Sequence, residues 1–375
     1  MRVATRVLLC LCVCPAFAAS RSLSAGPHRG QAADRSPARA ALLRDAEAAL
    51  AAGPFSVMDK QRVPPSGDKH DFLTLAPYWW PDPSRRGGLP YIRRDGEVNP
   101  ESKRDTDDVP FGRMTEAVTT LAAAYRETRD ERFASRAALL LRVWFLDAAT
   151  RMNPNLDYGQ GVPGRTTGRG AGIIATRKLV DILDTARLLA GSPSWAEPDR
   201  QGFGAWCSAY ARWLTTSRNG REEAEAANNH GTWYEAQLAA LLLYTGRPEE
   251  AKARCEGAKR RLASQVEPDG RQPRELERTR SWSYSVMNLH GWFTMARLAA
   301  DAGVDLWNYR TPDGRSLRAA LDYLAPFAGG RARWPHQQIT PVDWTEFAGL
   351  LDQAASVWKA DHYRTLANQL RSAAQ

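Results

Sequence analysis

The sequence predicts an all-α fold and, within that class, an (α/α) toroid: an incomplete α/α barrel with long lid loops. Apolar residues recur at the helical period along most of the chain, Pro and Gly residues separate the periodic runs, and no run alternates convincingly as a strand does. About ten antiparallel helices with short connections and no clear repeat fit a toroid or an irregular helical solenoid. We favour the toroid.

The first 18 residues are predicted to be a secretory signal peptide. Two arginines precede an apolar run that a proline breaks, and a small-residue pattern follows, so we expect cleavage after Ala18. Residues 19–36, rich in Ser, Arg, Gly and Ala, are expected to be a flexible leader. Residues 37–375 then form one helical domain, which we expect to be monomeric and to be periplasmic or secreted.

The net charge is +9, and removal of Arg2 and Arg6 with the signal leaves +7. This excess favours polyanionic partners. Because the chain is expected to be exported, we expect no nucleic acid among these partners. Beyond the signal no apolar stretch approaches the roughly 18 residues that cross a bilayer, so we expect no membrane association after the signal is removed.

Two cysteines, Cys207 and Cys255, stay in the mature chain. They fit one disulfide in an oxidising compartment or two unpaired buried thiols, and the sequence leaves both open. The chain has no CxxC pair, no HExxH motif and no close spacing of histidines. We therefore expect neither a metal site nor a cofactor.

Helical periodicity predicts the elements of the domain in order. The first helix covers roughly 38–51, and single apolar faces mark helices around Met114 to Tyr125 and Trp206 to Leu214. Further helices are predicted at 132–148, 172–190, 230–244, 248–264, 284–301, 315–327 and 344–371. Two long segments, 53–110 and 151–171, lack this periodicity and are expected to be lid or binding loops.

The first long loop carries Lys69 and His70, followed by the aromatic run Tyr78, Trp79 and Trp80. Clustered aromatic side chains form flat surfaces that stack on sugar rings, and nearby cations pair with carboxylates. The alternative, that the aromatics close the core under the loop, has equal weight.

The second long loop offers Tyr158 and Gln160 among glycines. No strand is predicted before it and no Lys-Ser/Thr pair follows, so a phosphate cradle is a weak interpretation. A polar lining for sugar hydroxyls fits better.

Two motifs stand at predicted helix starts. Asn228, Asn229 and His230 begin the helix at 230–244, where side-chain and backbone donors can meet an anion. Arg278 and Tyr284 bracket the start of another helix, with Arg280 between them. The alternative interpretations are a helix cap with a core histidine, and a solvated basic turn with a buried tyrosine.

Taken together, these motifs resemble the alginate lyase superfamily of polysaccharide lyases, from about residue 55 to 340. The motifs that carry the resemblance are Lys69-His70-Asp71, Tyr78-Trp79-Trp80-Pro81, Asn153-Pro154, Asn228-Asn229-His230-Gly231 and Arg278-Thr279-Arg280-Ser281-Trp282-Ser283-Tyr284. The resemblance implies an (α/α) toroid with a deep cleft and a lid, which cuts 1,4-linked polyuronate by metal-independent β-elimination. Trp282-Ser283 stands where Leu-His is common in the family.

By matching position, the resemblance assigns catalysis to Asn229, His230, Arg278 and Tyr284, with Arg280 as a competing arginine. Tyr284 is expected to take the C5 proton as a phenolate and return a proton to O4, which requires neighbouring arginines to lower its pKa. In β-D-mannuronate and β-D-glucuronate these two atoms lie on one face of the ring. One tyrosine can therefore serve both steps, so poly-mannuronate is preferred and glucuronan is the alternative.

Two other function classes remain. A glycoside hydrolase on the same toroid needs two opposed carboxylates, for which the candidates are Asp71, Asp107, Asp108 and Asp157. A non-catalytic protein that binds acidic polysaccharide would keep the basic cleft and leave Tyr284 idle.

Overall fold

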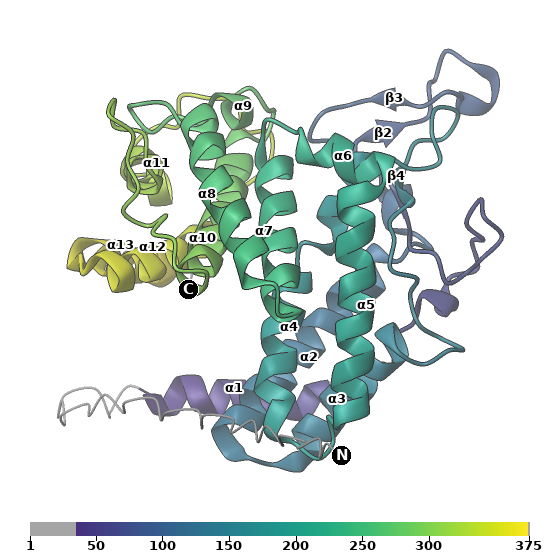
Figure 1. The fold of residues 1–375 in the computed structure, drawn as a ribbon. Coiled ribbons are helices and arrows are strands. Elements are labelled where there is room, and N and C mark those ends of the chain that lie inside the picture. Colours follow the sequence, from purple (N-terminus) through teal and green to yellow (C-terminus); the bar gives the residue numbers. More distant parts are fainter. Residues whose placement is uncertain (1–34, 374–375) are drawn as a thin grey trace, which may run out of the picture. The chain divides into compact units, whose positions relative to one another are not determined.

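Helices account for most of residues 35–373, the part of the chain that the computed structural model describes (Figure 1). The predicted signal peptide and nearly all of the predicted leader lie outside these residues. The α-helices are α1 (Arg35–Ala49), α2 (Asp108–Thr128), α3 (Glu131–Phe145), α4 (Leu179–Leu188), α5 (Glu197–Thr216), α6 (Arg218–Ala224), α7 (Asn229–Tyr244), α8 (Pro248–Gln265), α9 (Pro273–Leu276), α10 (Ser281–Asp301), α11 (Leu317–Leu324), α12 (Trp344–Trp358) and α13 (Asp361–Ala373). The all-α prediction is confirmed.

The chain divides by its contacts into residues 1–41 and 42–375. The described part of the first unit is the start of α1, which begins at Arg35, two residues before the predicted domain boundary. Everything below concerns the second unit. None of the helices within residues 35–373 is long and apolar enough to cross a bilayer.

Helix pairs joined by tight turns build the second unit. α2 packs on α3, α7 on α8, and α12 on α13, and the connection in each pair is only two or three residues long, so each pair is antiparallel. The chain reverses again between α8 and α10, and α10 packs against α7. These two helices therefore run in the same direction, and their first turns lie at the same end.

Three predicted helices differ from the observed ones at their ends. The run 344–371 is two helices, because Lys359 adopts a left-handed conformation (φ 53°) that ends α12. The run 172–190 begins as the 3-10 helix Gly170–Thr176 before α4. The run 315–327 is α11 followed by the 3-10 helix Ala325–Gly330. Other 3-10 turns are Val57–Asp59, Arg86–Gly88, Pro100–Lys103 and Leu189–Gly191.

Short strands connect the two long loops that the sequence predicted. β1 (Leu73–Leu75) of the first loop pairs in parallel with β4 (Tyr158–Gly161) of the second. Within the first loop, β2 (Trp79–Trp80) pairs antiparallel with β3 (Ile92–Arg93). We call residues 76–99, which contain this pair, the lid hairpin. Strands of two to four residues are too short to show alternation, which is why the sequence did not reveal them.

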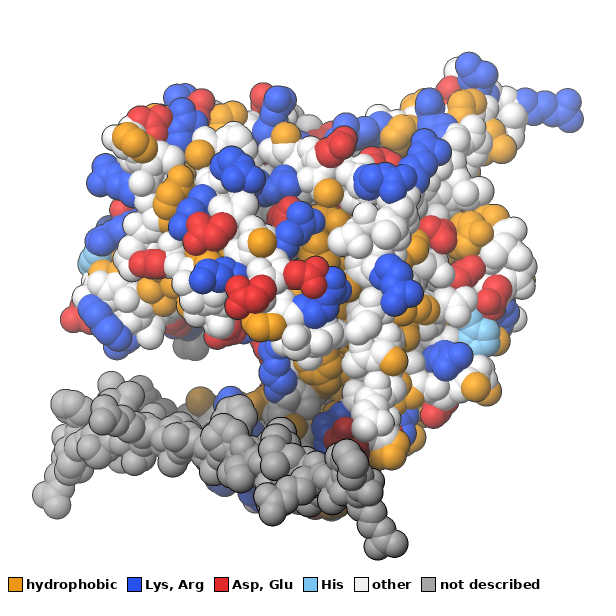
Figure 2. Space-filling view, viewed as in Figure 1, with side chains coloured by type: hydrophobic (Ala, Val, Ile, Leu, Met, Phe, Trp, Pro, Cys, Tyr) orange, Lys and Arg blue, Asp and Glu red, His pale blue; other side chains and the backbone are white. Residues whose placement is uncertain are grey.

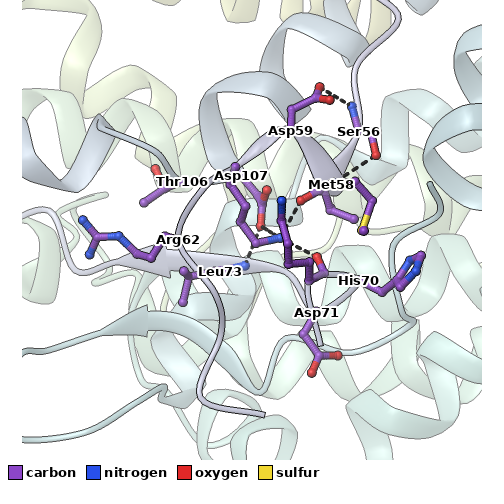
Figure 3. Close-up of polar contacts among 12 residues, drawn as sticks. Ser56, Met58, Asp59, Arg62, His70, Asp71, Leu73, Thr106 and Asp107 are labelled. Carbon is purple, nitrogen blue, oxygen red and sulfur yellow. Dashed lines mark hydrogen bonds and ion pairs between the residues drawn. The ribbon is translucent and has the colours of Figure 1, made fainter. Parts of the chain in front are cut away.

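A buried ion pair fixes the root of the first loop. Lys60 Nζ lies 3.0 Å from Asp107 Oδ2 and donates to the carbonyl oxygens of Val57 and Lys69, each at 2.7 Å. The Leu73 backbone N–H also donates to Asp107, toward which it points in Figure 3. Burial lowers the pKa of Lys60 and raises that of Asp107 to about 7, while each charge opposes the shift of the other.

We expect Lys60→Met to lower the free energy of unfolding by about 3–5 kcal/mol, because it leaves the Asp107 carboxylate buried without its counter-charge. Denaturant unfolding of the single variant and of Lys60→Met/Asp107→Asn measures this. The double variant is expected to recover much of the loss, since its new amide oxygen would still accept from the Leu73 backbone N–H. Equal loss in both proteins would show that the penalty does not come from the unpaired charge.

Cys207 and Cys255 are unpaired and fully buried. Of the two arrangements that the sequence left open, the structure therefore has the free thiols. Burial raises the pKa of Cys207 and raises that of Cys255 to about 12. Neither thiol is a reactive thiolate at neutral pH.

Candidate active site

A cavity of about 1130 Å³ lies between the lid hairpin, the 3-10 helix before α4, and the first turns of α7 and α10. Most of the site residues predicted from the sequence line it: Tyr78, Trp79, Gln160, Asn228, Asn229, His230, Arg278, Arg280 and Tyr284. The structure thus brings together segments that lie more than 200 positions apart in the chain.

The basic excess of the chain contributes to this cavity. On the face shown in Figure 2, basic side chains are interspersed with acidic ones over α5, α7 and α8 and do not form one broad patch. The cavity wall contains more basic than acidic residues: Arg93, Lys103, Arg169, Arg177, Lys178, Arg278 and Arg280 against Asp108, Asp181, Glu222, Glu223 and Glu346. The first turns of two parallel helices add the positive ends of their dipoles. An anionic ligand is therefore suited to the cavity.

Tyr284 lies in the first turn of α10, and its hydroxyl donates to the hydroxyl of Tyr78 at 2.6 Å. The Arg278 guanidinium carbon lies 3.8 Å from the centre of the Tyr284 ring. Burial raises the pKa of Tyr284 strongly and Tyr78 raises it further, whereas Arg278 lowers it. The expectation that neighbouring arginines lower the pKa of Tyr284 is therefore wrong in this structure, because desolvation outweighs the arginine.

Arg278 is not a free cation. Its Nε and Nη2 atoms donate to the carboxylate of Asp95 in the lid hairpin, at 3.0 and 2.8 Å. Burial alone would raise the pKa of Asp95, but the hydrogen bonds from Arg278 and Thr279 hold it well below its ordinary value. Asp95 is thus ionised across the working pH range.

Asn229 is fully buried at the start of α7 and is held by Glu275. Its backbone N–H and its Nδ2 atom each donate to a carboxyl oxygen of Glu275 at 2.7 Å. Its Oδ1 atom has no hydrogen-bond partner within the described residues. Burial raises the pKa of Glu275, and the hydrogen bonds from Asn229 oppose this only in part.

His230 is oriented by an acid. Its Nδ1 atom lies 2.6 Å from Oε1 of Glu223, a side chain that is only 3% exposed. This contact favours a proton on Nδ1 and leaves Nε2 for a ligand. Asn228 is the N-cap of α7, since its side-chain oxygen accepts from the His230 backbone N–H.

The aromatic lid provides one cavity-facing tryptophan. Arg165 and Arg169 lie over the ring of Trp79, at 5.1 and 5.9 Å from its centre. These two arginines join the second loop to the lid, and within the second loop Arg169 also donates to the Gln160 side chain at 2.6 Å.

Four predicted binding residues, Lys69, His70, Trp80 and Tyr158, are not among the residues that line the cavity. His70 Nδ1 contacts the Arg151 carbonyl at 2.6 Å, and Trp80 donates to the Glu97 carbonyl at 3.0 Å. Neighbouring residues of a strand face opposite sides, so only one of the paired tryptophans in β2 can face the cavity.

The carboxylates considered for a hydrolase do not form an opposed pair in the cavity. Asp71 accepts from Ser66, Asn153 and Asn155, Asp157 accepts from Trp213, and Asp107 pairs with Lys60. Of these four carboxylates, only Asp108 is among the residues that line the cavity.

Sequence reasoning missed three acids of the site: Asp95, Glu223 and Glu275. The Asp95-Gly96 pair is a turn signal, and Glu275 stands beside the Arg278 motif, but neither pattern reveals a partner. Within residues 35–373, no cluster of three or more His, Cys, Asp or Glu side chains could hold a metal ion.

Comparisons with known proteins agree with this geometry. The sequence model of the alginate lyase family matches residues 56–334. The crystal structure of an alginate lyase from Bacteroides ovatus is similar, with 42% sequence identity over 89% of each chain and a TM-score of 0.86.

More distant similarity extends to alginate lyase A1-III from Sphingomonas species A1, at 18% identity over 88% of each chain and a TM-score of 0.55. The structure of an alginate lyase A1-III variant complexed with tetrasaccharide is also similar, with 17% sequence identity over 88% of each chain and a TM-score of 0.57. These fold similarities confirm the predicted (α/α) toroid. A comparison with curated proteins finds no significant match.

Proposed function

Because the chain belongs to the alginate lyase family, we propose that it is an exported polysaccharide lyase that cleaves 1,4-linked polyuronate by β-elimination, with poly-mannuronate preferred. The observation that carries this proposal is the convergence of Tyr284, Arg278, Asn229 and His230 on one cavity. An exported enzyme of this kind meets its polymer in the periplasm or outside the cell. Each cleavage leaves a 4,5-unsaturated uronate at the new non-reducing end of one product and a new reducing end on the other.

Elimination begins at C5, whose proton is weakly acidic because its removal spreads charge onto the uronate carboxylate. Hydrogen bonds that strengthen as this charge develops lower the barrier. The dipoles of α7 and α10 and the cavity arginines provide a positive field for that charge. His230, held by Glu223 through Nδ1, presents Nε2 either to the carboxylate or as a second base.

Asn229 supplies a further donor once its amide has turned. Nδ2 points at Glu275, and burial raises the pKa of that carboxyl, which makes its protonated form easier to reach. A protonated Glu275 donates to Oδ1 of Asn229, which turns Nδ2 toward the substrate carboxylate. This orientation also gives a partner to the Oδ1 atom that otherwise has none.

Tyr284 then transfers the protons. The Tyr78 hydroxyl at 2.6 Å can donate to the Tyr284 phenolate, and Arg278 over the ring stabilises the same charge. After taking the C5 proton, the Tyr284 phenol protonates the departing O4. The shared face of these two atoms in mannuronate favours poly-mannuronate, and glucuronan, which differs only at C2, is the second candidate.

The proposal is tested by ultraviolet absorbance when the mature protein is mixed with poly-mannuronate, poly-guluronate, glucuronan or hyaluronan. Elimination creates a conjugated C4=C5 double bond and hydrolysis does not. We expect absorbance to rise first on poly-mannuronate. New reducing ends without absorbance would indicate a hydrolase, and the absence of both changes would indicate a binding protein.

Tyr78→Ala is expected to raise KM more than it lowers kcat, because it removes an aromatic side chain from the lid and leaves Tyr284 in place. Initial rates over a range of polymer concentrations measure both constants. The exposed lid residue Arg86, replaced by Ala, is the matched control. If neither constant changes in Tyr78→Ala, this part of the lid closes the core and does not contact substrate.

A further inference from the structure

The lid hairpin places a carboxylate on the arginine beside the catalytic tyrosine. Asp95 Oδ1 accepts from both Nε and Nη2 of Arg278, and Asp95 Oδ2 accepts from the Thr279 backbone N–H at 3.1 Å and the Thr279 hydroxyl at 3.0 Å. Arg93 donates to the same carboxylate at 2.7 Å. The lid hairpin therefore contacts the residues before α10 through one carboxylate, whose two oxygens both accept hydrogen bonds.

The turn that carries Asp95 is shaped for this contact. Gly96 has a φ of 77°, and a Cβ atom at this position would lie 2.3 Å from the Thr279 hydroxyl oxygen. Only glycine brings the turn so close. The Thr279 hydroxyl also donates to the Asp95 carbonyl at 2.7 Å, so backbone and side chain of the turn are both held.

The contact determines where the Arg278 guanidinium lies. Two of its donors are committed to Asp95, and its carbon lies 3.8 Å from the centre of the Tyr284 ring. In this position Arg278 acts on Tyr284 through its charge, whereas a uronate carboxylate would have to compete with Asp95 for its forked donors. Arg280, the other cavity arginine before α10, donates through Nε to the Thr340 hydroxyl at 3.1 Å, and its terminal nitrogens are placed to meet that carboxylate.

We propose that Asp95 is a positioning residue for elimination, whose carboxylate holds Arg278 against the Tyr284 ring when the lid hairpin is in place. This inference rests on the proposed function and deepens it. It makes the lid part of the proton-transfer site as well as a cover. The cation beside the tyrosine is held in this place only while the hairpin lies against the residues before α10.

The charged groups that face Tyr284 determine the direction in which its pKa changes when Asp95 is replaced. Tyr78 and Asp95 reach it from the lid and Arg278 from the segment before α10, while Arg280 and His230 line the same cavity. The Arg278 charge lowers the pKa of Tyr284 more than the Asp95 charge raises it. If loss of Asp95 releases Arg278, the pKa of Tyr284 rises. If Arg278 stays over the ring without Asp95, that pKa falls.

The test is Asp95→Asn in the full mature chain, with Asp82→Asn as the matched lid control, since Asp82 bonds only within the lid hairpin. We expect kcat/KM at neutral pH to fall about 10²-fold, the usual effect of a misplaced catalytic group. We also expect the rising limb of the pH profile to move to higher pH. A shift to lower pH, or a change in KM alone, overturns the inference.

Two further measurements keep the test independent of substrate choice and of folding. Carbon-13 NMR of ring-labelled tyrosine, with Tyr284→Phe to assign the signal, follows the Tyr284 pKa directly, so it decides the inference even if the tested polymers are not cleaved. Arg278→Lys keeps the charge but not the fork. Adding Asp95→Asn to Arg278→Lys is expected to cause little further loss, whereas independent losses would show that Asp95 acts elsewhere.

Discussion

Tyr284→Phe is expected to lower kcat on polyuronate by about 10²–10⁴-fold, the usual contribution of a proton-transfer group, and to leave oligosaccharide binding nearly intact. The ring stays beside Arg278, so the cavity keeps its shape, but no group remains to take the C5 proton and return one to O4. Absorbance of the unsaturated product gives the rate, and calorimetry with a uronate oligosaccharide gives the affinity.

Tyr78→Phe is the matched control for this variant. It removes the same hydroxyl contact from the other side and leaves the Tyr284 hydroxyl in the cavity. We expect a smaller loss of kcat than in Tyr284→Phe. Near-normal turnover in Tyr284→Phe would assign the proton transfer to another residue, with His230 as the first to examine.

Glu275→Ala is expected to lower kcat by about 10²–10³-fold, the effect of losing one donor to a developing anion. The substitution leaves the backbone N–H and the side chain of fully buried Asn229 without their acceptors. Asn229 then has no defined orientation toward the substrate. Steady-state rates measure this loss, and circular dichroism checks that the variant folds.

Glu275→Gln separates the two protonation states of this carboxyl. Glutamine imitates the protonated acid, because it accepts from the Asn229 backbone and donates to its Oδ1 atom. We expect activity close to that of the parent enzyme. If the Gln variant is as impaired as the Ala variant, the negative charge of Glu275 is needed and the Asn229 amide does not turn.

Local patterns revealed the elements and residues whose signal is contiguous in the chain. The helical period placed α7 and α10 within a few residues of their observed starts. The side chains that open these helices, Asn229 and Tyr284, could be assigned a role only through the family resemblance, because capping explains a polar group at a helix start equally well.

Other parts of the site depend on contacts that no local pattern contains. Asp95 and Arg278 are 183 positions apart, and Glu275 reaches back 46 positions to Asn229. These acids look like ordinary surface residues in the sequence, since only the folded chain shows which cation or amide each one meets.

The prediction that the whole aromatic run lines the site was wrong in part for a different reason. Composition identified Tyr78, Trp79 and Trp80 as one group, but β2 pairs with β3 and so turns the two tryptophans to opposite sides. The prediction of a lowered pKa for Tyr284 was wrong for a similar reason. The sequence shows the neighbouring arginines, but it does not show the burial that outweighs them.

The two buried thiols make the protein ready for site-specific labelling. In protein made without residues 1–18, which hold the other three cysteines of the sequence, Cys207 and Cys255 are inaccessible and have raised pKa values, so a maleimide dye should react only with a cysteine introduced on the surface. Arg86→Cys would place that cysteine at an exposed position of the lid hairpin. A fluorophore there would report opening and closing of the hairpin during turnover, with no need to remove the native cysteines from the core.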